Sequence, residues 1–213
     1  MHEMAAQAGA HSGLCFVGGG ARSGKTAIAL AIASSVARPR YYIIATAQAY
    51  DDEMRVRIAR HQHEREGEFT TVEAPYAVAP ALQELGSQGA VVIDCLTLWL
   101  SNLILRGNDD DAVLAQVDQL IQVAQTRDAL TVVISNEVGL GIVPDNPLAR
   151  RFRDLSGWAH QRLAAQAKQV YWACFGLALR LLPAPMLVGA PGDVFTGAKR
   201  VSSTDDRSGV TGS

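Results

Sequence analysis

The sequence is poor in cysteine and in aromatic residues, and neither sign of charge dominates it. Only 3 of its 213 residues are cysteines, and 6% are aromatic. Cys15, Cys95 and Cys174 lie in apolar segments without C-x-x-C spacing. We therefore expect buried thiols of a reducing compartment, and neither a disulfide framework nor a cysteine metal site. The formal net charge of −2 gives no electrostatic basis for binding nucleic acid or an anionic membrane.

Long apolar runs and targeting signals are also lacking. The longest apolar run, around residues 170–179, has about ten residues, whereas a membrane-spanning helix needs about twenty. Residues 1–12 lack the basic start and the apolar core of a signal peptide. We therefore expect a cytoplasmic protein without a membrane span.

What is present is the composition of one globular α/β domain. Hydrophobic residues make up 48% of the chain and charged residues 19%, and the length suits a single core. Short apolar segments alternate with helical patterns, which predicts a mostly parallel sheet with helices on both faces. The expected strands cover residues 14–17, 41–45, 69–73, 90–94, 130–135 and 169–175, with a further one at 177–182. The expected helices cover residues 27–36, 51–66, 77–85, 96–105, 112–126 and 147–168.

The domain boundaries are expected where this alternation stops. Residues 1–12 are predicted to be a flexible extension, and residues 13–183 the folded domain. Beyond Pro183 the composition turns to Pro, Gly, Ser, Thr and Asp, which predicts a mostly disordered tail over 184–213. In the last long helix, apolar residues at helical spacing are expected to form a buried stripe: Leu148, Phe152, Leu155, Ala159 and Leu163.

The segment between the first expected strand and helix follows the phosphate-binding pattern G-x-x-x-x-G-K-T. It consists of Gly19, Gly20, Ala21, Arg22, Ser23, Gly24, Lys25 and Thr26. Glycines let successive backbone N–H groups and the helix N-terminus face phosphate oxygens. Lys25 can then reach the β- and γ-phosphates, and the Thr26 hydroxyl can bind Mg²⁺. The segment therefore predicts the nucleoside-triphosphate site of a P-loop NTPase.

Asp94 ends the apolar strand expected at 90–94. In a P-loop fold, a carboxylate at that point lies beside Thr26 and can hold Mg²⁺ directly or through water. The alternative is an aspartate that only caps the following helix. With the phosphate-binding loop in place, we favour the metal role.

Two histidines lie on the helix expected at 51–66. His61 shares a stripe with Met54 and Ile58, and an arginine lies four residues away on either side. These cations disfavour the imidazolium form and would keep the ring neutral and nucleophilic, although Glu64 has the opposite effect. The local sequence leaves two interpretations of His61 open: a nucleophile that faces a cleft, or a solvated helical histidine. His63 faces another direction and fits the second.

Other polar residues follow apolar strands or gather on one helix. Glu73 and Glu137 end strands on the side where α/β sheets bind ligands. Either could bind a base, a ribose or a second substrate, or could cap a helix. Arg150, Arg151 and Arg153 could meet substrate phosphate, although a solvated helix face is the favoured interpretation.

Several motifs together point to one family. They are GGARSGKT, IATAQ followed by DDEMRVRIARH, VVIDCLTLWLSN, SNEVGLGIVPDN and RRFRDLSGWAHQRLA. In this order, from residue 14 to residue 182, they closely resemble the adenosylcobinamide kinase / adenosylcobinamide-phosphate guanylyltransferase family of cobalamin synthesis. The R-I-x-x-H helix and the N-E-V-G-x-G-I-V-P segment are not general P-loop features, so the resemblance is specific. It implies a RecA-like, mostly parallel sheet, assembled as a homotrimer.

The resemblance also implies two reactions and their residues. The first transfers the γ-phosphoryl of ATP or GTP to the hydroxyl of adenosylcobinamide. The second moves GMP from GTP to adenosylcobinamide phosphate, giving adenosyl-GDP-cobinamide and pyrophosphate, with Mg²⁺ as the cofactor. The family's nucleophile is the histidine of R-I-x-x-H, which falls on His61, and Lys25 balances charge on the leaving pyrophosphate. Nucleotide contacts are further implied at Ala45, Thr46, Ala47, Gln62, His63, Glu64, Arg65, Glu73 and Asp94.

The chain departs from the family pattern at two places, and two other functions stay open. The last long helix of the family typically carries Asn before its Gln, where this chain has His160 before Gln161, which puts a polar contact in question. The 184–213 tail has no counterpart. A kinase of another small alcohol would leave His61 idle. A RecA-like nucleic-acid-dependent ATPase or a nucleotide-gated binding module would need a basic surface, against which the slight net acidity argues.

Overall fold

The computed structural model describes residues 12–36, 40–48, 68–183 and 186–189. The strands are β1 (Gly13–Gly19), β2 (Tyr41–Ala45), β3 (Thr70–Glu73), β4 (Ala90–Asp94), β5 (Leu130–Asn136), β6 (Gln169–Cys174), β7 (Leu177–Leu182) and β8 (Met186–Gly189). The helices are α1 (Lys25–Ser34), α3 (Val78–Glu84), α4 (Leu96–Leu105), α5 (Asp110–Thr126) and α6 (Pro147–Gln166). The elements expected within these ranges are present, with ends shifted by one or two residues at most.

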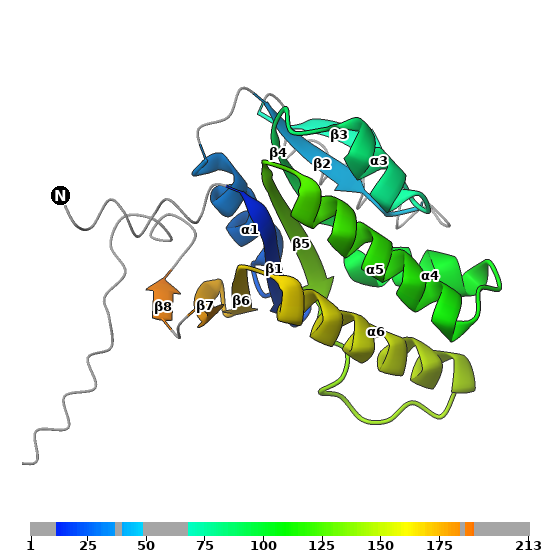
Figure 1. Cartoon of the computed structure of the whole chain (residues 1–213). Helices are drawn as coiled ribbons and strands as arrows, with labels where there is room; N and C mark the ends of the chain where they lie inside the picture. Colours follow the sequence, from blue (N-terminus) through cyan, green and yellow to red (C-terminus); the bar gives the residue numbers. More distant parts are fainter. Residues whose placement is uncertain (1–11, 37–39, 49–67, 184–185, 190–213) are drawn as a thin grey trace, which may run out of the picture.

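The described strands form one sheet in the order β3-β2-β4-β5-β1-β6-β7-β8. The first six strands of this order pair in parallel: β3, β2, β4, β5, β1 and β6. Strands β7 and β8 pair antiparallel with their neighbours. Parallel neighbours need crossover connections, and within the described residues α1, α3, α4, α5 and α6 lie in such connections (Figure 1). The order places β5 between β1, which leads into the phosphate-binding loop, and β4, which ends in Asp94.

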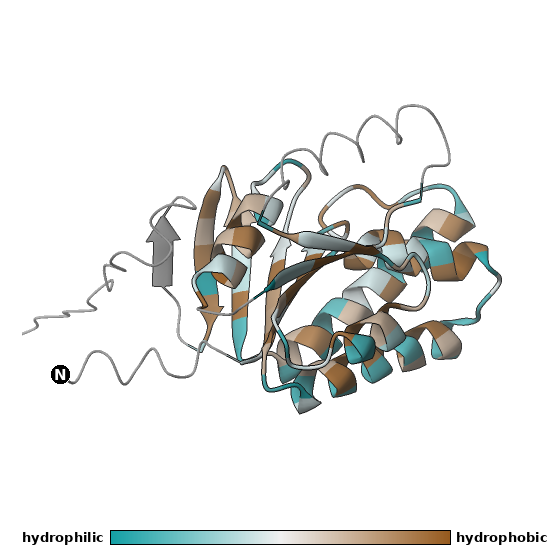
Figure 2. Cartoon of the chain, turned by 90° about the horizontal axis from the view of Figure 1, so that it is seen from above, coloured by the Kyte–Doolittle hydropathy of each residue, from teal (hydrophilic) through white to brown (hydrophobic). Residues whose placement is uncertain are grey.

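Two apolar layers cover the two faces of the sheet. In β1, Leu14 and Phe16 belong to the layer shared with α3, α4, α5 and α6, whereas Cys15 and Val17 belong to the layer shared with α1. This alternation follows from the two-residue period of a strand. The helices carry both hydrophobic and hydrophilic residues, as expected for helices that bury only one side (Figure 2). The predicted P-loop α/β fold, a mostly parallel sheet with helices on both faces, is confirmed.

Three details of the prediction are wrong. Leu148 is 47% exposed, because the first turn of α6 follows an exposed loop and lacks the neighbours that bury Leu155 and Leu163 farther along. Cys174 is half-buried, whereas Cys15 and Cys95 are buried. The folded part does not end at Pro183, because β8 adds a strand that pairs with β7.

Some predictions concern parts of the chain outside the described residues. These parts are residues 1–11, residues 190–213 and the helix expected at 51–66. None of the described helices is long and apolar enough to cross a membrane.

Candidate nucleotide-binding site

The phosphate-binding loop occupies the turn between β1 and α1, at the carboxyl edge of the sheet. Two glycines in it are required by close packing. A Cβ on Gly19, where φ is 157°, would lie 2.3 Å from the carbonyl oxygen of Ala173. Gly24, where φ is 93°, caps α1 in a left-handed conformation, and a Cβ there would lie 3.1 Å from the Cα of Gly176. No side chain caps the first N–H groups of α1, which are the groups that bind phosphate in such loops.

Lys25 lies inside this loop. Its Nζ donates to the carbonyl oxygen of Gly20 at 2.5 Å and lies 3.3 Å from Ser23 Oγ. Burial lowers the pKa of Lys25 below its usual value, and the nearby Cys95 and Asp94 oppose this shift. The ammonium group is therefore held by acceptors of the loop itself, and a phosphate could replace the Gly20 carbonyl as its partner. Thr26, the next residue, is half-buried in the first turn of α1.

Asp94 and Glu73 lie in one row across the sheet. Ala45, the last residue of β2, pairs with Glu73 on one side and with Asp94 on the other. The structure thus brings three of the predicted nucleotide-binding residues together at the carboxyl ends of neighbouring strands. Glu73 is exposed and Asp94 is half-buried. The charge of Asp94 raises the pKa of Lys25, opposing the effect of burial, so the two groups interact electrostatically.

Thr46 is buried and holds two strands together. Its hydroxyl accepts a hydrogen bond from the backbone N–H of Cys95 and donates to the carbonyl oxygen of the same residue, each at 2.8 Å. Its own carbonyl accepts from Asn102 Nδ2 at 2.8 Å. The side chain therefore fixes the residue that follows Asp94, and this contact was not predicted from the sequence. Ala47 follows as a half-buried residue.

The residues at this edge fit a magnesium ion that arrives with a nucleotide. Among the described residues, no group of three His, Cys, Asp or Glu side chains could hold a metal by itself. Mg²⁺ in kinase and ATPase sites needs only one or two protein ligands, because phosphates and waters complete its octahedron. The hydroxyl of Thr26 and the carboxylate of Asp94 are of the donor types that this set requires.

A polar cluster at the end of β5 was only partly anticipated. The backbone N–H of Glu137 donates to the carbonyl oxygen of Gly19 at 2.9 Å, which ties it to the start of the phosphate-binding loop. Glu137 also lies 3.5 Å from Nδ1 of His160, whose Nε2 is 2.7 Å from Ser135 Oγ. The sequence marked Glu137 as a strand-end acid and His160 as a departure from the family. Nothing local to either residue indicated that they meet.

The arginines of α6 are engaged with neighbouring backbone and side chains. Arg150 donates to the carbonyls of Pro144 and Asp145. Arg151 pairs with Asp110 at 2.6 Å, and Arg153 donates to the carbonyl oxygen of Gly139 at 2.6 Å. They hold the loop before α6 and the start of α5, which neither interpretation of this cluster anticipated.

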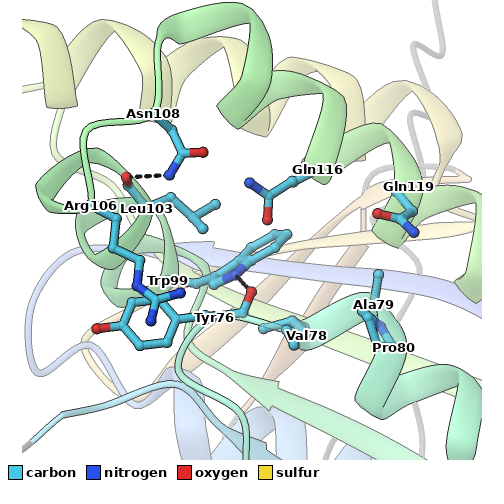
Figure 3. A pocket seen from close by; sticks show the side chains of 11 residues that line it. Tyr76, Val78, Ala79, Pro80, Trp99, Leu103, Arg106, Asn108, Gln116 and Gln119 are labelled. Carbon is cyan, nitrogen blue, oxygen red and sulfur yellow. Dashed lines mark hydrogen bonds between the residues drawn. The ribbon is translucent and has the colours of Figure 1, made fainter.

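A separate pocket of about 290 Å³ lies between α3, α4 and α5 (Figure 3). Trp99 Nε1 donates to the carbonyl oxygen of Tyr76 at 2.7 Å, and the Arg106 guanidinium lies 3.4 Å above the Tyr76 ring. Amide side chains of Gln116 and Gln119 line its opposite side. The sequence did not predict this pocket.

The remaining predicted site residues lie outside the described residues; they are His61, Gln62, His63, Glu64 and Arg65. Their roles stay predictions.

The fold and this loop define a P-loop nucleotide-binding protein of the α/β class. A protein-family model described as "Cobinamide kinase / cobinamide phosphate guanyltransferase" matches residues 15–181. The chain therefore belongs to this family, which confirms the resemblance identified from the motifs.

Individual relatives and one solved structure are also similar to this chain. Over 169 residues it is 38% identical to the bifunctional adenosylcobalamin biosynthesis protein CobP of Pseudomonas aeruginosa, covering 79% of this chain and 96% of that protein. Over 181 residues it is 35% identical to the bifunctional adenosylcobalamin biosynthesis protein CobU of Salmonella typhimurium, covering 79% of this chain and 99% of that protein. The crystal structure of the RadB recombinase matches with a TM-score of 0.48 and 17% identity, covering 84% of this chain and 82% of the other.

Proposed function

We propose that this protein carries out two successive reactions of cobalamin synthesis. It phosphorylates adenosylcobinamide with ATP or GTP, and then transfers GMP from GTP to adenosylcobinamide phosphate, giving adenosyl-GDP-cobinamide and pyrophosphate. The observation that supports this most directly is the placement of Lys25 and Asp94 at one edge of the sheet, in a chain whose family match spans residues 15–181.

In both reactions the loop binds the triphosphate of the nucleotide. The N–H groups at the start of α1 hold phosphate oxygens, and Lys25 exchanges its bond to the Gly20 carbonyl for one to phosphate. Thr26 and Asp94 would hold Mg²⁺, which supplies positive charge against the phosphate oxygens as the leaving group departs. Lys25 adds to this charge from inside the loop.

For the second reaction we propose a covalent intermediate on His61. A neutral ring nitrogen attacks the α-phosphorus of GTP, a nitrogen–phosphorus bond forms, and the bond to the leaving pyrophosphate breaks. The phosphate of adenosylcobinamide phosphate then attacks the same phosphorus and displaces the imidazole. One difficult displacement thereby becomes two easier ones. The R-I-x-x-H motif around His61 supports this assignment.

The decisive experiment is to look for GMP on the polypeptide. The full chain is incubated with α-labelled GTP and Mg²⁺ and denatured, with His61→Ala and His63→Ala as a matched pair. We expect acid-labile, base-stable label that only His61→Ala abolishes. Label lost only in His63→Ala would move the nucleophile to that residue. No label on a protein that still binds GTP would contradict the covalent mechanism and favour a kinase of another small alcohol.

The kinase reaction is tested separately with γ-labelled ATP or GTP and adenosylcobinamide. We expect labelled adenosylcobinamide phosphate, and its absence would contradict the first half of the proposal. Hydrolysis that rises severalfold when DNA is added would instead favour a nucleic-acid-dependent ATPase.

The proposal includes a cytoplasmic homotrimer, which the resemblance supports. Light scattering coupled to size-exclusion chromatography should give three times the chain mass of 22.7 kDa. A monomer mass would contradict it.

A further inference from the structure

The end of β5 lies beside the phosphate-binding loop. β5 is hydrogen-bonded between β1 and β4, so its carboxyl end lies between the loop that carries Lys25 and the strand that ends in Asp94. Gly19 pairs with Asn136, and the N–H of Glu137 donates to the Gly19 carbonyl at 2.9 Å. A γ-phosphate held by Lys25, with its metal ion at Asp94, is therefore flanked by the residues that end β5.

Two neighbouring groups restrain the carboxylate of Glu137. Oε1 accepts a hydrogen bond from the N–H of Gly139 at 2.5 Å, and Oε2 lies 3.5 Å from Nδ1 of His160. Arg153 holds Gly139 in turn, through a bond to its carbonyl oxygen at 2.6 Å. The Glu137 side chain keeps 22% of its surface exposed. It is thus a restrained carboxylate that a substrate can still reach.

His160 is placed to orient this carboxylate. Its side chain is only 13% exposed, and its ring lies 5.5 Å from that of Phe16. Burial, the larger effect, lowers the pKa of His160 and favours the neutral ring, whereas the charge of Glu137 opposes that shift. A neutral imidazole has one donor and one acceptor nitrogen. Donation from Nδ1 to Glu137, with acceptance by Nε2 from the hydroxyl of Ser135, satisfies all three groups.

Phosphoryl transfer to an alcohol needs a group that takes up the hydroxyl proton. In the site described above, Lys25, Thr26 and Asp94 act on the phosphates and the metal ion, and none of them serves the acceptor. A carboxylate beside a triphosphate is repelled by it, so its presence there is useful when it binds metal or receives a proton. Glu137 already has two donors on its oxygens, which orient it for the second task.

We propose that Glu137 is a catalytic residue of the kinase reaction, the base that receives the proton of the substrate hydroxyl, and that His160 is its positioning residue. This inference rests on the proposed function. The hydroxyl oxygen forms a bond to the γ-phosphorus while the bond between that phosphorus and the β-phosphate oxygen breaks. The electron pair of the broken bond stays with the nucleoside diphosphate. The hydroxyl proton passes to a carboxylate oxygen of Glu137 and leaves for solvent through its exposed side.

The two proposed reactions differ in their need for such a base. The acceptor of the first is an alcohol, whose proton must be removed. The acceptor of the second is a phosphate monoester, which is already an anion near neutral pH and has no proton to lose. Glu137 is therefore required for phosphorylation and dispensable for guanylyl transfer.

The test compares Glu137→Gln with the wild type in both reactions, using the full chain. Phosphorylation is measured with γ-labelled nucleotide and adenosylcobinamide, and guanylyl transfer with α-labelled GTP and adenosylcobinamide phosphate. General base catalysis contributes about 10²–10⁴-fold, so we expect kcat of phosphorylation to fall at least 100-fold. The KM for nucleotide and the rate of guanylyl transfer should stay within about threefold of wild type, because the amide keeps the size of the side chain.

Each other outcome has a defined meaning. A variant that phosphorylates normally, or that loses both reactions in parallel, would overturn the role of Glu137. A wild-type protein without either reaction would refute the proposed function itself, and the inference with it. The two failures are therefore distinguishable.

The positioning role of His160 is tested with a matched pair. His160→Phe keeps a ring against Phe16 but removes both nitrogens, whereas His160→Asn keeps a side-chain donor. We expect His160→Phe to lower kcat of phosphorylation about tenfold with unchanged nucleotide KM, and His160→Asn to retain most of it. Guanylyl transfer and GTP binding should be preserved in both, which also reports folding. Equal losses in the two variants, or losses in both reactions, would mean that His160 acts only through packing.

Discussion

Replacing Thr46 by valine should destabilise the sheet at the point where β2 and β4 end. Valine has nearly the same shape as threonine but lacks the hydroxyl. In the wild type this hydroxyl accepts from the N–H of Cys95 and donates to its carbonyl, each at 2.8 Å, and Thr46 is fully buried. No water can replace the lost partner without opening the core.

The magnitude follows from the groups left without partners. A buried N–H that loses its acceptor costs roughly 1–3 kcal/mol, and the lost bond to the carbonyl adds about 1 kcal/mol. We therefore expect Thr46→Val to lower the free energy of unfolding by about 2–4 kcal/mol. For a domain of this size that corresponds to a fall in Tm of about 5–15 °C.

Urea unfolding followed by tryptophan fluorescence measures this change, with Thr46→Ser as the control. Serine keeps the hydroxyl and loses one methyl group, which costs about 1 kcal/mol. A loss below about 0.5 kcal/mol in Thr46→Val, or an equal loss in both variants, would refute this reasoning. Since Thr46 is also a predicted nucleotide contact, GTP affinity is measured on both. A normal stability with weakened GTP binding would assign the hydroxyl to the ligand instead.

Three further perturbations test other parts of the site and fold. Gly19→Ala should abolish nucleotide binding and lower the free energy of unfolding by about 1–3 kcal/mol, because its Cβ would lie 2.3 Å from a carbonyl oxygen on β6. Gly20→Ala is the control, because its Cβ would have no atom within 4 Å and should leave the thermal unfolding temperature unchanged. Equal unfolding temperatures for the two variants would contradict this prediction. Arg127→Lys should lower the free energy of unfolding, measured in urea, by about 2–4 kcal/mol. The guanidinium donates from three nitrogens to the carbonyls of Gly86 and Gly89 and to the hydroxyl of Thr131, and one ammonium group cannot replace all three bonds. A loss under 1 kcal/mol would contradict this prediction. Burial lowers the pKa of His160 in the folded protein, so the histidine binds a proton more readily in the unfolded chain. The folded protein therefore loses stability as the pH falls below the unfolded pKa, which is near 6.5. Between pH 7.5 and 5.5 the wild type should therefore lose more stability than His160→Asn, by up to about 1.4 kcal/mol per pH unit, whereas parallel losses in urea unfolding would show that His160 does not contribute.

Much of the fold was predictable because its signals are local. The central parallel strands β1, β4 and β5 are buried on both faces, and the strand from Leu130 to Asn136 is an example of the short apolar runs that result. The burial of the first turn of α6 could be predicted less well. Its helical period shows which side of the helix is apolar, but not how far the neighbouring layer extends, and so Leu148 was wrongly expected to be buried.

Strand β8 was missed for a related reason. Its residues follow Pro183 in a segment whose composition is typical of loops, and the strand exists because β7 offers an unpaired edge. An edge that recruits a strand is a property of the assembled sheet, so no window of the sequence shows it.

The phosphate-binding loop was determined by the sequence itself. Eight consecutive residues, Gly19 to Thr26, carry the glycines, the lysine and the hydroxyl, and the preceding strand and following helix are encoded beside them. By contrast, tertiary structure alone decided that Glu137 meets His160 and that both lie at the base of this loop. Ser135 and His160 are 25 residues apart in the chain, and they meet because β5 inserts between β1 and β4 and α6 packs across its end. Strand order and helix packing depend on the sum of many long-range contacts, which no short pattern in a single sequence records.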